Sequence, residues 1–276
     1  MRSGKGVIAL VLLAVVFGFG VYLARQQFST VPDEDHAQCT VGKVSLDQGQ
    51  LASASTIAAV GIGRELPEHA IVIALATALQ ESKLRNLQHL GSRNDHDSVG
   101  LFQQRPSQGW GTEEQLLDPR FAANAFFDAL LKIEGWDSLR ITEAAQRVQK
   151  SAYPEAYEKW ADEAQVLAGA LTGGTPGSVE CATPAYAEPP LPAADHLRGD
   201  FGDAAPTVHA SQDTLVMPVA DTRSGWQVAH WLVAQADVTG VTKVAYRDQE
   251  WSADNGTWVT KTSISNEVTA QVLPAR

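Results

Sequence analysis

The sequence predicts an all-α domain followed by a small α/β domain, behind an N-terminal transmembrane helix. Its 276 residues are 44% apolar and 19% charged, which suits one or two globular domains with a buried core. Helical patterns of apolar residues fill the stretch 47–172, whereas strand patterns occur only after residue 198. An apolar run precedes both parts of the chain.

The N-terminal apolar run extends from Val7 to Ala24 and follows two cations, Arg2 and Lys5. At about 1.5 Å per residue it spans roughly 27 Å, which is close to the thickness of a bilayer core. A cleaved signal peptide has a shorter apolar region and a small-x-small cleavage site. Here Arg25 follows directly, so the run is expected to stay as a signal-anchor.

This pattern also predicts where the protein is located. We expect residues 1–28 to form a cytoplasmic tip and a single membrane helix, with residues 7–24 in contact with the membrane. The cations before the run place residues 29–276 outside the cell membrane. Secretion after signal cleavage is the alternative. Nucleic acid is excluded as a partner, because a net charge of −11 opposes phosphate binding.

The chain contains two cysteines, Cys39 and Cys181, one on either side of the helical stretch. In an exported chain, two cysteines favour a disulfide over a metal site. We therefore expect a disulfide, and closing a loop of about 140 residues stabilises a fold by roughly 4–5 kcal/mol in the chain-entropy model. Two unpaired thiols are the alternative.

The stretch 47–172 is expected to be helical along most of its length. Apolar residues at helical spacing recur in it, and several runs begin with a capping residue or a proline. The expected helices cover about residues 47–63, 67–80, 118–133, 142–150 and 154–171. The polar, glycine-containing stretch 82–116 is expected to form loops.

The segments on either side of these helices have different patterns. The polar residues 29–46 are expected to form a stalk, and the proline-rich residues 173–198 an interdomain linker. Residues 199–276 combine strand-type alternation with one amphipathic helix, which predicts a small α/β domain. The expected strands and helix cover residues 214–219, 225–238, 241–246 and 256–263.

Glu81 is the candidate catalytic residue, because it follows directly on the buried helix expected at 67–80. The carbonyl end of a helix carries a partial negative charge, and an apolar environment disfavours an ionised carboxyl group. Both effects raise the pKa of the carboxyl group, which suits a general acid near neutral pH. A surface carboxylate at a frayed helix end is the alternative that position alone leaves open.

The residues around Glu81 resemble those of the lytic transglycosylases and the related goose-type lysozymes. Three elements in order carry the resemblance: Glu81-Ser82, Gly100-Leu101-Phe102-Gln103, and an alanine-rich helix at 144–149 followed by Tyr153 and Tyr157. The resemblance covers residues 47–172 and implies a lysozyme-like domain there. It implies an enzyme that acts on peptidoglycan glycan strands, at the bond between N-acetylmuramic acid and N-acetylglucosamine.

The resemblance also implies a role for each matching residue. Glu81 would protonate the glycosidic oxygen and then act as base on the muramoyl 6-hydroxyl group, which gives a 1,6-anhydro product. Other glycosidases need a second carboxylate, whereas in this family the acetamido group of the substrate assists, and no cofactor or metal ion is implied. The remaining matching residues would bind substrate or hold the loop around Glu81: Ser82, Gln103, Gln104, Gln146, Tyr153 and Tyr157.

Departures from the family pattern leave two alternatives open. The loop contains Asp95 and Asp97, either of which could be a second carboxylate that positions water. That arrangement predicts a hydrolytic muramidase, whereas a solvated turn is the plainer interpretation. Gln146 stands where the family usually has asparagine, which favours the other alternative, a cell-wall binding protein without catalysis.

From about Leu197 the chain resembles small secreted domains related to zinc D,D-carboxypeptidases, which often follow such lytic domains in actinobacterial proteins. The resemblance rests on His209-Ala210-Ser211 and on residues 225–234 and 244–251. An active member has aspartate seven residues after the first histidine and a later His-x-His as zinc ligands. Here Val216 stands at the seventh position and no histidine follows His230, so residues 199–276 are expected to be a degenerate relative without zinc.

Overall fold

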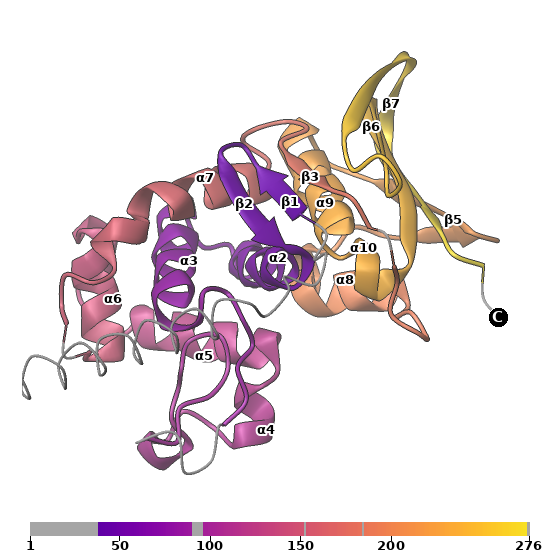
Figure 1. Ribbon diagram of the computed structural model, residues 1–276. Coiled ribbons are helices and arrows are strands. Elements are labelled where there is room, and N and C mark those ends of the chain that lie inside the picture. Colours follow the sequence, from indigo (N-terminus) through magenta and orange to yellow (C-terminus); the bar gives the residue numbers. More distant parts are fainter. Residues whose placement is uncertain (1–37, 90–95, 152, 184, 275–276) are drawn as a thin grey trace, which may run out of the picture. The chain divides into compact units, whose positions relative to one another are not determined.

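The computed structural model describes residues 38–89, 96–151, 153–183 and 185–274, which belong to one compact unit (Figure 1). The first strand, β1 (Gln38–Val41), lies between β2 (Val44–Asp47) and β3 (Val179–Cys181) in an antiparallel sheet. Cys39 and Cys181 are direct neighbours across β1 and β3, and they form the expected disulfide. The pairing joins chain segments that are 142 residues apart.

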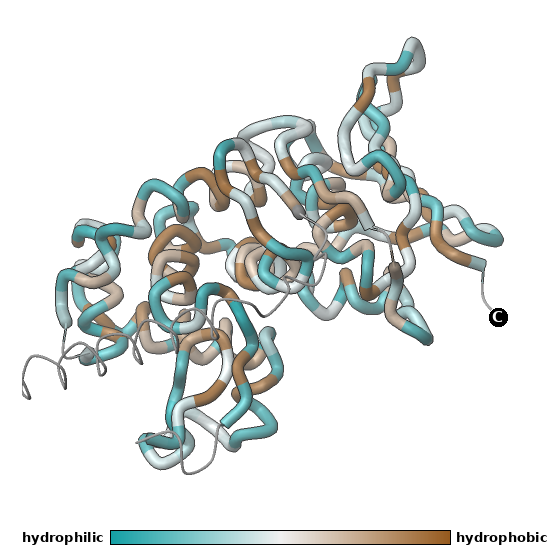
Figure 2. The backbone as a smooth tube through the Cα atoms, in the orientation of Figure 1, coloured by the Kyte–Doolittle hydropathy of each residue, from teal (hydrophilic) through white to brown (hydrophobic). Residues whose placement is uncertain are grey.

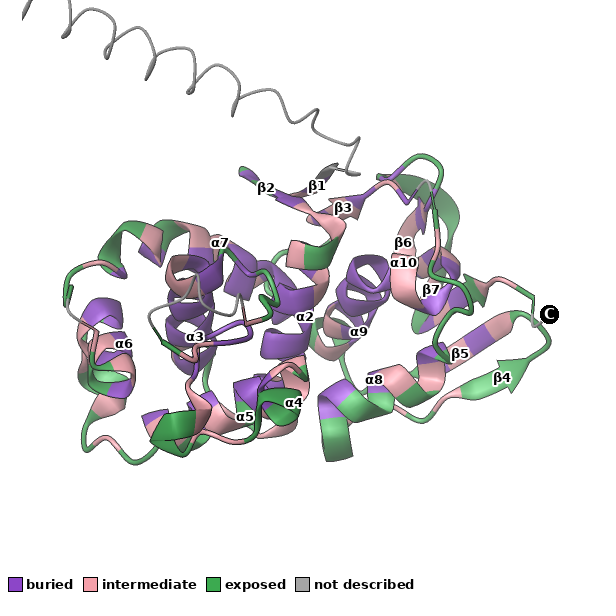
Figure 3. Ribbon diagram, turned by 60° about the horizontal axis from the view of Figure 1, so that its bottom comes forward, coloured by how far each residue is buried: buried purple, intermediate pink, exposed green. Residues whose placement is uncertain are grey.

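Six α-helices follow β2, and two of them form the centre of the core. They are α2 (Gln48–Gly63), α3 (Glu68–Ser82), α4 (Glu113–Leu116), α5 (Pro119–Leu130), α6 (Ile141–Gln149) and α7 (Ala161–Leu171). Helices α2 and α3 are buried on nearly every face, as Figure 3 shows, and apolar residues recur along both of them (Figure 2). A helix that is apolar all round needs neighbours on every side. Helices α5, α6 and α7 supply them for α3.

Short 3₁₀ turns connect several of these helices. They are η2 (Pro106–Gln108), η3 (Trp136–Ser138) and η4 (Glu158–Trp160). Side-chain caps fix the start of three helices: Asp47 accepts from the backbone of Gln50 in α2, Thr112 caps α4, and Asp118 caps α5 in front of a proline.

The C-terminal part of the chain adds a second antiparallel sheet, in the order β4-β5-β7-β6. Its elements are α8 (Ala193–Phe201), η5 (Gly202–Ala204), β4 (His209–Ser211), β5 (Thr214–Pro218), α9 (Thr222–Ala234), α10 (Ala236–Thr239), β6 (Val241–Ser252) and β7 (Trp258–Val272). Helix α9 contacts β6 and β7 and also α2 and α7. The helices of the N-terminal part and the second sheet therefore share one core cluster.

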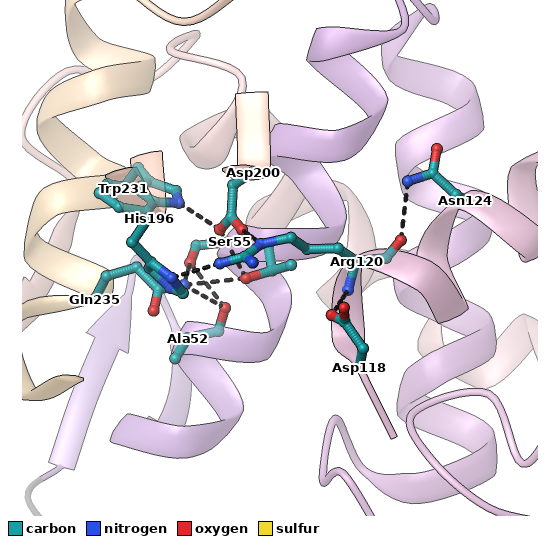
Figure 4. A network of polar contacts seen from close by, with 10 residues as sticks. Ala52, Ser55, Asp118, Arg120, Asn124, His196, Asp200, Trp231 and Gln235 are labelled. Carbon is teal, nitrogen blue, oxygen red and sulfur yellow. Dashed lines mark hydrogen bonds and ion pairs between the residues drawn. The ribbon is translucent and has the colours of Figure 1, made fainter. Parts of the chain in front are cut away.

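A buried polar network joins α2, α5, α8 and α9 (Figure 4). The Asp200 carboxylate accepts hydrogen bonds from Arg120 Nε, Thr56 Oγ1 and Trp231 Nε1 at 2.5, 2.9 and 2.8 Å. Gln235 Nε2 donates to the carbonyl oxygen of Ala52, and it also lies within hydrogen-bonding distance of hydroxyl groups on α2. The buried side chains of Asp200, Trp231 and Gln235 thus each have a partner on another element, as burial requires.

The expected fold class, an all-α domain and a small α/β domain behind a transmembrane helix, is wrong. The chain is mixed α/β with two antiparallel sheets, and the first sheet takes strands from the expected stalk and the expected linker. Strands β1 and β2 have 4 residues each, the shortest run in which a period-two signal is recognised, and β3 has 3. Two isolated bridges, Leu87 with Gly100 and Val99 with Gln104, add β structure to the expected loop.

The transmembrane helix of that fold class is not among the elements that the structure describes. Within residues 38–274, apart from the gaps given above, no helix has the length and apolarity needed to cross a bilayer. The run at residues 7–24 lies outside the described residues. Asp95 also lies outside them.

Candidate active site

Glu81 lies in the last turn of α3, and its carboxylate is hydrogen-bonded to the side chain of Tyr157. The Tyr157 hydroxyl group donates to Glu81 Oε1 at 2.8 Å. Burial raises the pKa of Glu81, while hydrogen bonds from Tyr157 and Gln149 oppose part of that rise. The result is a carboxyl group that holds its proton to higher pH than an exposed glutamate does.

A left-handed turn ends α3 and fixes the position of Glu81. Lys83 and Leu84 have φ angles of 58° and 60°, which is uncommon outside glycine and costs energy. The amide groups of these two residues donate to carbonyl oxygens of the last helical turns, and the Leu84 side chain is fully buried. Burial of Leu84 offsets the cost of the turn, so the helix ends at a defined place beside Glu81.

Ser82 joins the end of α3 to the loop that carries the Gly-Leu-Phe-Gln element. Ser82 is buried, and its Oγ donates to the carbonyl oxygen of Leu101 at 2.7 Å. A Cβ atom on Gly100, where φ is +74°, would lie 2.3 Å from the carbonyl oxygen of Leu116. Only glycine fits at that position. The structure thus places Ser82 in support of the loop.

The two glutamines of the loop differ in exposure. Gln103 is partly exposed and donates to the carbonyl oxygen of Gly100 at 3.0 Å. Gln104 is 2% exposed and donates to the carbonyl oxygen of Ala122 at 3.3 Å, so it is a core residue. Phe102 is fully buried and stacks on Phe126 at 4.7 Å between ring centroids.

Gln149, which is not among the residues that the family resemblance identified, is a neighbour of Glu81. Its side chain hydrogen-bonds Glu81, and its Nε2 donates to the carbonyl oxygen of Phe102 at 2.7 Å. Gln146, one turn earlier in α6, donates instead to the carbonyl oxygen of Ser151 at 2.8 Å. Residues three apart share one face of a helix. That spacing is the signal that could have extended the expectation from Gln146 to Gln149.

The two tyrosines after α6 occupy different environments. Tyr157 is fully buried, and its burial and the nearby charge of Glu81 both raise the pKa of its hydroxyl group. Tyr157 therefore stays protonated and can donate to Glu81 throughout the neutral range. Tyr153 is 75% exposed, and its backbone amide group donates to the Ser151 hydroxyl oxygen at 3.0 Å. The structure brings Tyr157, not the ring of Tyr153, into contact with Glu81.

Asp97 is held within its own loop. Its carboxylate accepts from Arg105 Nε at 3.1 Å and from the backbone amide and hydroxyl groups of Ser107 at 2.7 and 2.8 Å. These donors hold the pKa of Asp97 well below its usual range. The ionised Asp97 side chain therefore stabilises the loop. These contacts do not link it to Glu81.

His209 and His230, the two histidines considered as zinc ligands in the C-terminal part, lie on different elements, β4 and α9. His209 and Val216 are cross-strand partners in β4 and β5, so the seven-residue spacing does bring positions 209 and 216 side by side. His230 is buried in α9, where Nδ1 donates to the carbonyl oxygen of Ala170 at 2.8 Å. Across the residues that the structure describes, no group of three histidine, cysteine or acidic side chains could hold a metal ion.

Comparison of the sequence with protein-family models finds no match. Comparison with curated proteins likewise finds no match. The assignment of an activity therefore depends on the motif and on the geometry around Glu81.

Proposed function

We propose that the protein cleaves the glycosidic bond between N-acetylmuramic acid and N-acetylglucosamine in peptidoglycan, as lytic transglycosylases do. The observation that carries this proposal is the partly buried Glu81 carboxyl group, whose pKa is raised and whose Oε1 accepts from Tyr157 at 2.8 Å. This carboxyl group belongs to the Glu-Ser element of the family, and the buried Ser82 joins that element to the Gly-Leu-Phe-Gln element.

The environment of Glu81 suits a residue that first donates and then accepts a proton. Burial favours the neutral form, which protonates the glycosidic oxygen as the bond breaks. Tyr157 and Gln149 donate to the carboxylate that remains, which limits the cost of its charge. The carboxylate then removes the proton of the muramoyl 6-hydroxyl group, whose oxygen closes the 1,6-anhydro ring. Glu81 ends each turnover protonated, as it began.

Two alternatives differ from this proposal in what they predict. A hydrolytic muramidase would use water in place of the 6-hydroxyl group and would leave reducing ends. A cell-wall binding protein without catalysis would bind the glycan strands and release nothing. The disulfide supports action outside the cytoplasm in either case, because such bonds persist in oxidising compartments.

The test compares release of soluble muropeptides from purified peptidoglycan sacculi by the wild type and by Glu81→Gln. We expect release to fall about 100- to 10,000-fold, the usual contribution of a general acid. Glu134→Gln is the matched control, because Glu134 is an exposed loop residue. Its activity should equal that of the wild type. Equal release by the wild type and Glu81→Gln would contradict an enzymatic function.

A further inference from the structure

A cavity of about 510 Å³ lies between β2, the end of α3 and the start of α7. Lys83, two residues after Glu81, lines it together with Trp160. Trp160 Nε1 donates to the side-chain oxygen of Gln80 at 2.9 Å, and Gln80 precedes Glu81. The cavity and the carboxyl group thus share the last turn of α3.

Three lysines line this cavity, Lys43, Lys83 and Lys159. Lys83 Nζ lies 3.4 Å from the centroid of the Trp160 ring, and Lys159 Nζ lies 5.4 Å from the same centroid. None of the three forms an ion pair with a residue that the structure describes. The protein as a whole carries a net charge of −11, so a cluster of three positively charged side chains stands out on it.

The position of Lys83 is fixed by its backbone. It is the left-handed residue that ends α3, and Gln50 Nε2 donates to its carbonyl oxygen at 2.8 Å. Because two like charges share the Trp160 ring, each opposes the other. Burial and the charge of Lys159 lower the pKa of Lys83, which reflects the cost of holding the two ammonium groups beside one ring.

Two carboxylates, Asp162 and Glu163, also line the cavity. Both lie in the first turn of α7, where the positive end of the helix favours acidic side chains. Glu163 opposes part of the fall in the pKa of Lys83, but neither carboxylate pairs with a lysine. The lysines therefore outnumber the carboxylates, and their ammonium groups can bind an added anion.

We propose that this cavity binds an anionic substituent of the glycan strand, a carboxylate or a phosphate, beside the sugars held at Glu81. The inference rests on the proposed function, because that function brings the strand to Glu81. An anion between Lys83 and Lys159 removes their repulsion and forms charge-assisted hydrogen bonds. Leu79 and the Trp160 ring offer apolar surface to the part of the substituent that carries the anion. Strands that carry the anion therefore bind more tightly than strands without it.

The test measures binding to the full-length Glu81→Gln protein, which removes cleavage from the experiment. The ligands are soluble glycan strands with peptide stems, the same strands after carbodiimide coupling of their carboxylates to glycinamide, and strands freed of phosphate-linked polymers by hydrofluoric acid. We expect loss of the anion to weaken binding about tenfold, the effect of one or two partly exposed ion pairs. Weaker binding after the coupling to glycinamide identifies carboxylates, and weaker binding after the acid treatment identifies phosphates.

Lys83→Gln and Lys159→Gln are added together to the Glu81→Gln protein. This protein should bind all strands as weakly as Glu81→Gln alone binds strands without the anion. Lys132→Gln is the matched control, because Lys132 is exposed in the loop after α5. The Lys132→Gln control should retain the full difference in binding between strands with and without the anion. Equal binding of all strands, or a double variant that retains the difference, would overturn the inference. A wild type that releases no muropeptides from sacculi, together with a Glu81→Gln protein that still shows the binding difference, would instead refute only the proposed function.

Discussion

Replacing Asp200 with alanine should lower the free energy of unfolding by about 3–5 kcal/mol, the usual cost of breaking a buried ion pair. The Asp200 side chain is 0% exposed and accepts hydrogen bonds from Arg120, Thr56 and Trp231. The variant leaves Thr56 and Trp231 as buried donors without an acceptor, at about 1–3 kcal/mol each. Arg120 contributes less, because its side chain is 33% exposed and can bind water.

Urea unfolding followed by tryptophan fluorescence measures this change, with the slope against urea expected to stay constant. Asp195→Ala is the matched control in the same helix, because its ion pair with Arg198 has side chains that are 71% and 65% exposed. That variant should stay within about 0.5 kcal/mol of the wild type. A loss below about 1 kcal/mol in Asp200→Ala would refute the view that this network holds α2, α5 and α9 together.

Three further predictions follow from single side chains. Burial lowers the pKa of His230 to about 4 from its ordinary 6.5. The unfolded chain therefore binds the proton first, and stability should fall as the pH drops from 6.5 to about 4, less so in His230→Gln. An equal loss of stability in the wild type and in His230→Gln over this pH range, measured by urea unfolding, would contradict this. Tyr157→Phe removes a donor to the carboxylate, so the pKa of Glu81 should rise in a carboxyl NMR titration; a fall would be inconsistent with the observed hydrogen bond. Replacing Cys39 and Cys181 with serine should cost roughly 4–5 kcal/mol in the same unfolding assay, and a change near zero would contradict it.

The helices could be predicted well where the signal is local. The pattern of apolar residues places a buried helix at 67–80, and α3 covers Glu68–Ser82. Asp118 and the proline after it mark the start of α5 because a cap and a first-turn proline act over a few residues. The expected helix at 154–171 begins only at Ala161, because a 3₁₀ turn precedes it.

The first sheet could not be predicted, because its order depends on contacts far apart in the sequence. Strand β3 holds 3 residues within a proline-rich segment, and only its pairing with β1 and the bond between Cys39 and Cys181 make it a strand. The presence of the disulfide was predictable from the number of cysteines. The cross-strand register that brings the two sulfur atoms together was not.

The candidate site shows the same division between local and distant information. Glu81 and Tyr157 stand in motif positions, and the structure joins them by a hydrogen bond across 76 positions of the sequence. Gln104 stands in the motif as well, yet it is buried against Ala122. Gln149 lies one helical turn after the motif residue Gln146, but it contacts Glu81 only because α6 packs against α3, and no local pattern encodes that packing.

The most direct test of the central claim is the mass of the products that the wild type releases from purified sacculi. The proposal predicts muropeptides that end in 1,6-anhydro sugars, each one water lighter than the corresponding reducing product, and their absence from digests with Glu81→Gln. Products with reducing ends alone would contradict transglycosylase chemistry at Glu81. A wild-type digest without soluble products would contradict the assignment of Glu81 as a catalytic acid.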